Sequence, residues 1–488
     1  MTFIPFAVPP GVYRNGTRYQ AKGRVYDSDL WRWPNNTSRP VGGWRNKTSD
    51  LLTGVARSAF TWRSNDNQAR ASFGTNQGLF YMSRPGAVSD ITPASFVPSS
   101  SNATTGGGYG RGKYGRGRYG TPRPDVVNTI PVKIWSLDNW GQNLVACYGA
   151  KIYEWTLNTA SPAVEIANAP EARSILVTEE RALLAIGADG DPRAVDWSDL
   201  EDNTDWTPTA TNQAGGRRLQ TSGALQCGRR IRGGYLIFSD SDVHLGTYAG
   251  LPLVYTFERL ATDCGTISQG SPIGVDDRAW WMGTNGFWTY DGFVKPLECD
   301  VQDYVFSNIN TGQVSKVVSL HNSEFGEVWW FYPSASSVEV DSYVYYSYRE
   351  QHWGIGKLAR TCGTARGEFQ YPLMVSPSGQ IYEHEVGQSR DGRSPFLLSG
   401  PIEIGEGERN MAVMSIIPDE TNLGDVSISF VTGDYPLSPD REVASTTAIA
   451  RTDTRFQDRR VSVRMIAAPD QDFRVGDFRF DVKQGSGR

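Results

Sequence analysis

Cysteine, histidine and long apolar runs are all scarce in this sequence of 488 residues. No window approaches the roughly 20 consecutive apolar residues of a membrane-spanning helix, so we do not expect this chain to be an integral membrane protein. The five cysteines lie far apart and form no CxxC pair, which predicts isolated apolar side chains in a reducing compartment. No cationic segment precedes the apolar residues at 1–10, which predicts that this stretch is not a secretory signal.

The usual signatures of catalysis are missing as well. The four histidines, His244, His321, His352 and His384, include no two at metal-ligand spacing. His384 lies between two glutamates, but adjacent residues of a strand point to opposite faces, so these side chains cannot all bind one ion. The sequence contains no GxSxG motif, Walker loop or dinucleotide fingerprint. We therefore predict no catalytic residue, no cofactor and no metal site, and hence that the protein is not an enzyme.

Glycine and aromatic residues, by contrast, are abundant. The chain has 52 Gly, 27 Pro and 12% aromatic residues, and these recur in short bursts with β-branched residues between turn formers. Such bursts are typical of an all-β chain, and the aromatic content argues against disorder along the whole length.

One short pattern recurs: an apolar strand, a tight turn with glycine, and a second strand that carries Tyr or Trp. Copies occupy 71–81, 144–155, 183–197, 235–248, 279–292, 328–348 and 373–382. After the first copy the spacing is roughly 40 to 55 residues, the length of a four-stranded propeller blade. Each hairpin exposes an apolar face that only a neighbouring blade can bury. We predict a β-propeller of six or seven blades, with tandem β-sandwiches as the competing architecture.

The pattern divides the chain into three predicted parts. Residues 1–50 form an extended basic N-terminal arm, 51–400 the propeller, and 401–488 a small antiparallel β domain. In the last part, apolar residues such as Val426, Ile428 and Phe430 alternate with polar ones, as in half-buried strands. The fold class is thus an all-β propeller with an N-terminal arm and a C-terminal domain resembling a β-sandwich.

The charge is distributed unevenly along the chain. Residues 1–150 hold 18 basic and 7 acidic residues, a net charge of +11, which leaves −16 for the remainder. A basic arm beside an acidic body suggests contact with an acidic partner or with phosphates. The candidate contact residues are Arg14, Arg18, Lys22 and Arg24. The alternative is that a loop-rich region uses arginine for solubility.

A glycine-rich loop interrupts the propeller at 99–124. It carries a Tyr-Gly-x-Gly-x repeat with Tyr109, Tyr114 and Tyr119 five residues apart. Glycine at this density holds neither helix nor regular strand, so we predict a long projecting loop. These tyrosines are candidate partner-binding residues. Contact with another protein, stacking on nucleic acid bases and a plain flexible insert all remain open.

Clustered acids between Trp197 and Trp206 raise the possibility of a sialidase-like propeller. Such a site also needs an arginine cluster, a tyrosine nucleophile and a general acid. The arginines at 217, 218, 229 and 230 are the candidates for that cluster. The simpler interpretation is a polar loop between strands that the two tryptophans anchor to a blade.

Several stretches resemble one family. They are PPGVYRNGTRYQAKGR at 9–24, WRW at 31–33, RPVGGW at 39–44, the Tyr-Gly-x-Gly run, the 197–206 string and FRVGDFRFDV at 473–482. Together these resemble the tail hub or nozzle proteins of short-tailed bacteriophages, also described as head-to-tail stabilisation proteins.

The resemblance implies a structural protein of the virion tail, assembled in the host bacterial cytoplasm. It implies a homo-oligomer, a ring of six copies, that docks below the portal-adaptor ring and retains the packaged DNA. Genomic DNA would pass through its channel without specific binding, and tail fibres or spikes would attach outside. The alternatives are a glycan-active propeller, such as a sialidase-like depolymerase, and a sugar-binding tail adhesin.

Overall fold

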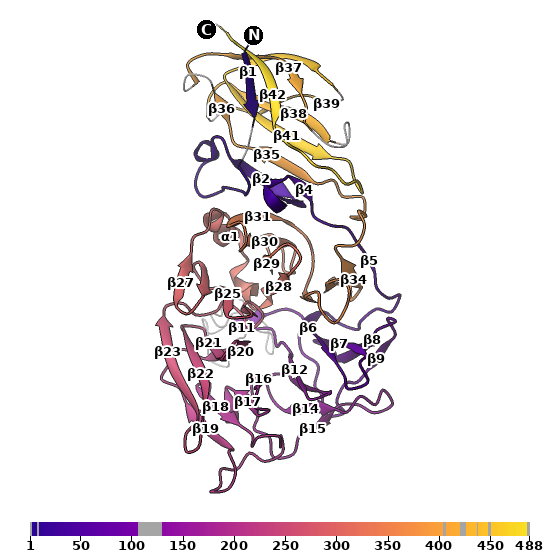
Figure 1. Ribbon diagram of the computed structural model, residues 1–488, viewed down its shortest axis with the longest axis vertical. Coiled ribbons are helices and arrows are strands. Elements are labelled where there is room, and N and C mark those ends of the chain that lie inside the picture. Colours follow the sequence, from indigo (N-terminus) through magenta and orange to yellow (C-terminus); the bar gives the residue numbers. More distant parts are fainter. Residues whose placement is uncertain are drawn as a thin grey trace, which may run out of the picture.

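The protein is built almost entirely of β-strands. A computed structural model describes residues 2–6, 9–105, 129–403, 407–419, 426–436, 438–447 and 450–485. Seven four-stranded antiparallel sheets form a β-propeller, and two further sheets form a domain beside it (Figure 1). Within the described residues, no helix is long and apolar enough to cross a membrane.

The seven propeller blades follow one another along the chain, and all except the seventh have their four strands in sequence order. Their strands are β6 (Ala56–Arg63), β7 (Ala69–Thr75), β8 (Leu79–Ser83) and β9 (Val88–Asp90) in blade 1; β12 (Ser136–Trp140), β13 (Asn143–Cys147), β14 (Ile152–Trp155) and β15 (Val164–Glu165) in blade 2; β16 (Ser174–Val177), β17 (Leu183–Ile186), β18 (Ala194–Trp197) and β19 (Gly215–Arg218) in blade 3; β20 (Leu225–Ile231), β21 (Gly234–Ser239), β22 (Asp242–Gly250) and β23 (Val254–Thr262) in blade 4; β24 (Ile273–Val275), β25 (Arg278–Met282), β26 (Phe287–Tyr290) and β27 (Val294–Leu297) in blade 5; β28 (Val318–Asn322), β29 (Glu327–Tyr332), β30 (Ser342–Ser347) and β31 (His352–Lys357) in blade 6; and β32 (Cys362–Thr364), β33 (Leu373–Val375) and β34 (Ile381–His384) in blade 7.

Each of the seven predicted hairpins supplies the two middle strands of one blade. The 279–292 copy, for example, contains β25 and β26, and the 373–382 copy contains β33 and the start of β34. Aromatic residues of these strands are buried between blades, among them Trp281 and Trp330 at 0% exposure. The predicted all-β propeller is therefore confirmed, with seven blades.

The seventh blade is completed by the N-terminal part of the chain. Strand β5 (Trp44–Asn46) pairs with β34, with Tyr382 opposite Asn46 and His384 opposite Trp44. This pairing closes the ring of blades with a strand made at the other end of the sequence. It also covers the edge of β34, which unpaired would invite aggregation, and gives blade 7 four strands like the other blades.

The predicted N-terminal arm does not stand apart from the body, and that prediction is corrected. Strands β1 (Thr2–Phe6) and β2 (Val25–Asp29) pair with β42 (Phe478–Gln484) and β35 (Phe396–Ser399). The short hairpin of β3 (Trp31–Arg32) and β4 (Arg39–Pro40) lies between the propeller and the second domain (Figure 1). Backbone hydrogen bonds to distant strands thus fix a segment whose local sequence suggested only an extended chain.

The second domain consists of two facing sheets. Besides β1, β2, β35 and β42, its strands are β36 (Ile402–Glu403), β37 (Met411–Ile417), β38 (Val426–Gly433), β39 (Arg441–Thr447), β40 (Thr452–Asp458) and β41 (Arg460–Ala467). Phe430 of one sheet packs on Phe456 and Phe480 of the other, with ring centroids 4.5 and 5.9 Å apart. This packing confirms the predicted β-sandwich, although N-terminal strands complete it.

Helical segments are few and short. They are η1 (Arg18–Ala21), η2 (Pro34–Asn36), η3 (Ala188–Gly190), α1 (Gln302–Asn308) and η4 (Thr311–Lys316). All five cysteines are buried and free, as predicted for isolated apolar side chains.

The first strand of each blade lies nearest the propeller axis. Successive first strands contact one another around the ring, from β6 and β12 through to β32 and back to β6. A parallel bridge joins Gly270, just before β24, to Val318, the first residue of β28. The innermost segments of blades 5 and 6 therefore run in the same direction. The axis is therefore bordered by seven strands, and residues at their starts and ends lie at different depths.

Candidate interaction site at the base of the inserted loop

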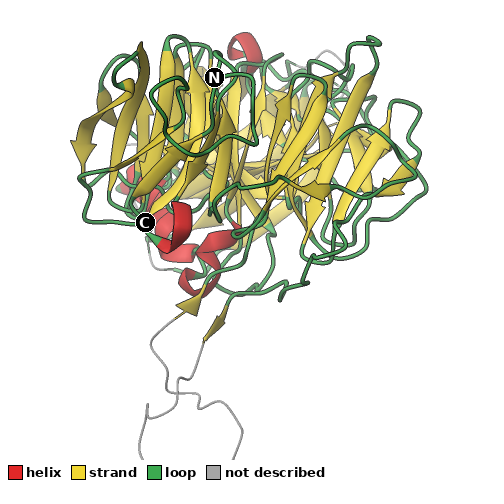
Figure 2. Ribbon diagram, turned by 90° about the horizontal axis from the view of Figure 1, so that it is seen from below, coloured by secondary structure: helices red, strands yellow, loops and turns green. Residues whose placement is uncertain are grey.

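The predicted projecting loop leaves the propeller through a short hairpin. Strands β10 (Thr104–Thr105) and β11 (Thr129–Ile130) pair antiparallel, with Thr104 opposite Ile130. Figure 2 shows two short strands projecting from one face of the propeller, where the described part of this segment ends. Residues Tyr109, Tyr114 and Tyr119 lie outside the described residues, so their predicted role in partner binding stays a prediction.

Segment η4 holds both backbone segments at the base of this hairpin. The Gln313 side chain accepts a hydrogen bond from the Ala103 amide at 3.0 Å and donates one to the Ala103 carbonyl at 2.9 Å. The Ser315 hydroxyl accepts from the Val132 amide at 3.1 Å. The backbone is therefore held before β10 and after β11 by one helical turn of the propeller body.

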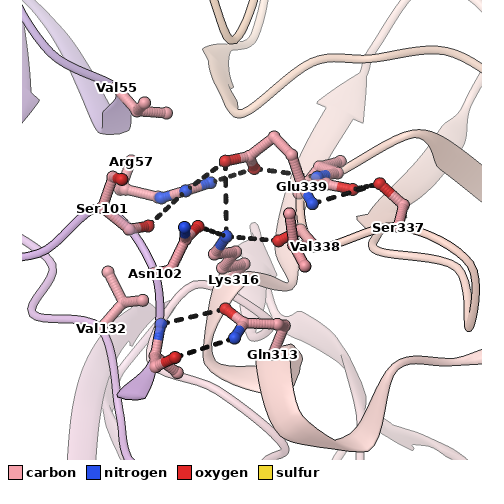
Figure 3. A network of polar contacts seen from close by, with 12 residues as sticks. Val55, Arg57, Ser101, Asn102, Val132, Gln313, Lys316, Ser337, Val338 and Glu339 are labelled. Atoms are coloured by element: carbon pink, nitrogen blue, oxygen red, sulfur yellow. Dashed lines mark hydrogen bonds and ion pairs between the residues drawn. The ribbon is translucent and has the colours of Figure 1, made fainter.

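A buried lysine strengthens this attachment. The Lys316 ammonium donates to Asn102 Oδ1 at 2.6 Å and to the Val338 carbonyl, and lies 3.4 Å from Glu339 Oε2 (Figure 3). Its side chain is 0% exposed. Burial, together with the nearby Arg57 charge, lowers the pKa of Lys316 from its usual value. An ammonium at this depth is tolerated because three oxygen atoms surround it.

Arg57, at the start of β6, completes the cluster. Its guanidinium donates to both carboxylate oxygens of Glu339 at 2.6 Å, and to the Ser101 carbonyl at 3.0 Å (Figure 3). Burial alone would raise the pKa of Glu339, but the hydrogen bonds and charge of Arg57 lower it instead. A bidentate pair of this kind is among the most directional contacts in proteins.

The arrangement fixes where the inserted loop begins. We call Arg57, Gln313, Lys316 and Glu339, with Ser101 and Asn102, the loop-base clamp. Two buried cations share one carboxylate, so the cluster keeps a net positive charge. Chemically it can position a chain and attract anions. Its rigid geometry suits a fixed mount for the loop better than a catalytic centre.

The four basic residues predicted to bind a partner have acidic partners within this chain. Arg14 pairs with Asp27 at 2.7 Å, Arg18 with Asp440 at 2.7 Å, Lys22 with Glu403 at 3.6 Å and Arg24 with Asp300 at 2.6 Å. Asp300 follows the last strand of blade 5, whereas Asp440 and Glu403 belong to the sandwich. The acidic surface that these residues contact is thus the protein's own, and they connect the N-terminal segment to both domains.

Charge reversal at three of these positions is a test of that role. We expect the variant with Arg14→Glu, Arg18→Glu and Arg24→Glu to lose about 1 kcal/mol of unfolding free energy per site at low salt. The loss should shrink at high salt, because these pairs are partly exposed and ions screen them. Urea unfolding at two salt concentrations measures both effects. Arg278→Glu, on an exposed strand end, is the control, and an equal effect there would contradict the role.

The residues considered for a sialidase-like site do not come together. Arg217 and Arg218 lie on β19, the outermost strand of blade 3, whereas Arg229 and Arg230 lie on β20, next to the axis. Asp202 and Asp205 instead accept hydrogen bonds from backbone amides of their own turns, and Asp199 accepts one from the Gln213 amide. Trp197 is buried, and its indole donates to the Gln213 carbonyl at 2.9 Å. The segment is a polar loop anchored to its blade, as the simpler interpretation had it.

The histidines are packed rather than grouped. His384 is buried, stacks on Trp44 and accepts a hydrogen bond from Arg360 Nε at 2.9 Å. Within the described residues, no three His, Cys, Asp or Glu side chains lie together as metal ligands would. Burial lowers the pKa of all four histidines from their ordinary value, that of His321 to about 4.

These lowered pKa values predict that acid destabilises the fold. Below about pH 6.5 the unfolded chain takes up protons on its histidines, whereas the folded chain does not. Stability is therefore fully present above that pH and falls as the pH decreases, by up to about 1.4 kcal/mol per pH unit for each histidine. The slope of the unfolding free energy against pH gives the number of protons taken up on unfolding. His321→Gln should lower that number by up to one between about pH 7 and pH 5, as measured by urea unfolding. An unchanged pH dependence in that variant would contradict the assignment.

Comparison with known proteins assigns no family to this chain. No protein-family model matches the chain, and no curated protein matches it. Similar solved structures include virginiamycin B lyase from Staphylococcus aureus, at 8% identity and a TM-score of 0.41, over 70% of this chain and 97% of that one. BamB from Moraxella catarrhalis has 10% identity and a TM-score of 0.32, over 71% and 97%. These bacterial proteins are β-propellers of differing function, so at such identity the similarity concerns the fold alone.

One sequence-based conclusion must be corrected in this light. The missing motifs led to the prediction that the protein is not an enzyme. Two of the similar propellers, virginiamycin B lyase and a streptogramin B lyase, are enzymes, at 8% and 9% identity. The absence of the motifs searched for therefore does not exclude catalysis by this chain. The lyase activity itself is not transferred to this chain.

Proposed function

We propose that this chain is a structural subunit of the tail hub or nozzle of a short-tailed bacteriophage. Copies of it would form a ring, with six as the number that the family resemblance implies. The ring would dock below the portal-adaptor, retain packaged DNA, conduct it during ejection, and carry fibres or spikes on its outside.

The loop-base clamp is the observation that best supports this proposal. Burying Lys316 and Arg57 is costly, and the contacts that offset this cost hold the chain at Ser101 and Asn102, just before the inserted loop. Such a cost is expected where the direction in which a loop leaves the body matters, as it does in an assembly. The motifs at 9–24 and 473–482 that resemble the family add to this support.

Assembly of the purified protein tests the proposal directly. We expect closed rings in negative-stain images and in native mass spectrometry, and co-migration with the adaptor ring. Lys316→Met should weaken docking while the propeller stays folded, because Arg57 and Glu339 still pair. Lys295→Met, an exposed lysine paired with Asp291 at 2.6 Å, is the matched control. A strictly monomeric protein that never binds the adaptor would count against the proposal.

A groove between blades 5 and 6 favours a second candidate function, the binding or processing of glycans. Its volume is about 370 Å³, and its lining includes Trp280, Tyr346 and Tyr348 together with the carboxylates of Asp291 and Glu298. The rings of Trp280 and Tyr348 stack on each other with their centroids 5.0 Å apart. Aromatic rings and acids are the groups that sugars meet in binding sites. Incubation with host polysaccharide tests for processing, because only cleavage releases reducing ends, and a glycan array tests for binding without cleavage.

A further inference from the structure

A cavity of about 280 Å³ lies on the propeller axis. Residues of all seven blades line it, from Arg57 and Ser58 in blade 1 to Cys362 and Gly363 in blade 7. It is separate from the groove between blades 5 and 6, and Arg57 is the one member of the loop-base clamp that also lines it. Its size is near the lower end for small-molecule sites, so it suits a small ligand and excludes a polymer.

Three arginines line this cavity. Arg57 is paired with Glu339, and Arg230 is paired with Asp138 at 2.5 Å. Arg229 differs, because it has no carboxylate within ion-pair distance among the described residues. Its guanidinium donates to the carbonyls of Pro272 at 2.7 Å, Gly228 at 2.8 Å and Gln269 at 2.9 Å. These carbonyls fix its orientation but leave its charge unneutralised.

The charge balance around the cavity is positive. Arg57, Arg229 and Arg230 face two carboxylates, and the buried Lys316 lies behind Arg57 next to the same Glu339. A surplus of positive charge in a partly desolvated cavity is costly unless an anion offsets it.

Arg229 also has free hydrogen-bond donors. Two of its five N–H groups remain after its three carbonyl contacts. The guanidinium can therefore donate to an anion in the cavity without losing the contacts that hold it.

We propose that the axial cavity is a binding site for a small phosphate-bearing ligand. Arg229 supplies the unneutralised charge, and its two remaining N–H groups donate to phosphate oxygens. Guanidinium groups match the spacing of phosphate oxygens and bind them through paired hydrogen bonds. This inference is independent of the proposed role in a phage tail.

Titration calorimetry on the full chain tests the site with two ligands, inorganic phosphate and AMP. We expect saturable binding of at least one, and a higher melting temperature in its presence. Binding of phosphate alone identifies a free anion as the ligand, whereas binding of AMP alone identifies a phosphate monoester. Arg229→Gln should weaken binding about tenfold or more, because it removes the charge. Arg232→Gln, an exposed arginine on the same hairpin, should bind like the wild type.

A second variant covers the case in which Arg229→Gln does not fold. Arg229→Lys keeps the positive charge but lacks the planar guanidinium, so the fold should be preserved, and we expect binding to weaken severalfold. The proposal is overturned if the wild type shows no saturable binding of either ligand at millimolar concentration. It is equally overturned if folded Arg229→Lys and any folded Arg229→Gln bind as tightly as Arg232→Gln.

Discussion

Replacing Arg32 with methionine is expected to lower the free energy of unfolding by about 3–5 kcal/mol. Arg32, on β3, is 1% exposed and donates to Glu327 at 2.9 Å and to Glu385 at 2.8 and 2.9 Å. Its guanidinium lies 3.8 Å from the centre of the Phe325 ring. Without it, two carboxylates from different blades are left buried without their common counter-charge.

The loss of stability in the Arg32→Met variant should also depend on pH. Burial alone would lower the pKa of Arg32, but the charges of Glu327 and Glu385 raise it above its usual value. Burial already raises the pKa of Glu327 in the native protein. Without Arg32 the folded state binds protons there more readily than the unfolded state, so the deficit in stability should grow as the pH increases.

Urea unfolding followed by tryptophan fluorescence measures both effects. The control is Arg45→Met, whose arginine side chain is 60% exposed and lies 2.8 Å from Glu383. An exposed pair is worth about 0–1 kcal/mol, so the control should be nearly neutral. If Arg32→Met were no less stable than the control, Arg32 would not hold these elements together.

Deletion of residues 1–48 is expected to prevent formation of a native propeller. The deletion removes β5 and so leaves β34 as an open edge of blade 7. It also removes Trp31, whose ring packs on Phe473 of the sandwich with centroids 4.6 Å apart. The shortened chain should aggregate, or lose its near-ultraviolet circular dichroism and cooperative unfolding.

A shorter deletion provides the matched control. Removal of residues 2–8 takes away only β1, at the edge of one sheet of the sandwich, and should leave the propeller folded. Adding a peptide of residues 1–48 to the longer deletion should restore part of the native signal. A longer deletion that unfolds cooperatively with an unchanged midpoint would contradict the closing role of β5.

Local patterns in the sequence predict the blades well because each hairpin is a local structure. The 279–292 copy, for example, contains both strands and the turn between them, and every contact that defines it lies within a few residues. The alternation at Val426, Ile428 and Phe430 is local in the same way. These features were predicted correctly from periodicity alone.

The pairings made over long distances could not be predicted in that way. Nothing near Trp44 indicates that β5 pairs with β34, since the partners are more than 330 residues apart. Arg32 looked like one more charge of a basic arm, because its partner Glu385 lies 353 residues away in the sequence. Lys316 left no signal in the sequence either, because a single lysine before a strand is ordinarily exposed.

The pairing of β1 with β42 has a consequence for synthesis of the protein in the cell. Strand β1 is translated long before its partner β42, since Thr2 lies opposite Val482. At about 5–20 residues per second, the delay between them is on the order of tens of seconds. During that time β1 is an unpaired edge, and a chain that terminates early never covers it. Incomplete translation products therefore keep an exposed, unpaired strand edge that proteases or chaperones can recognise.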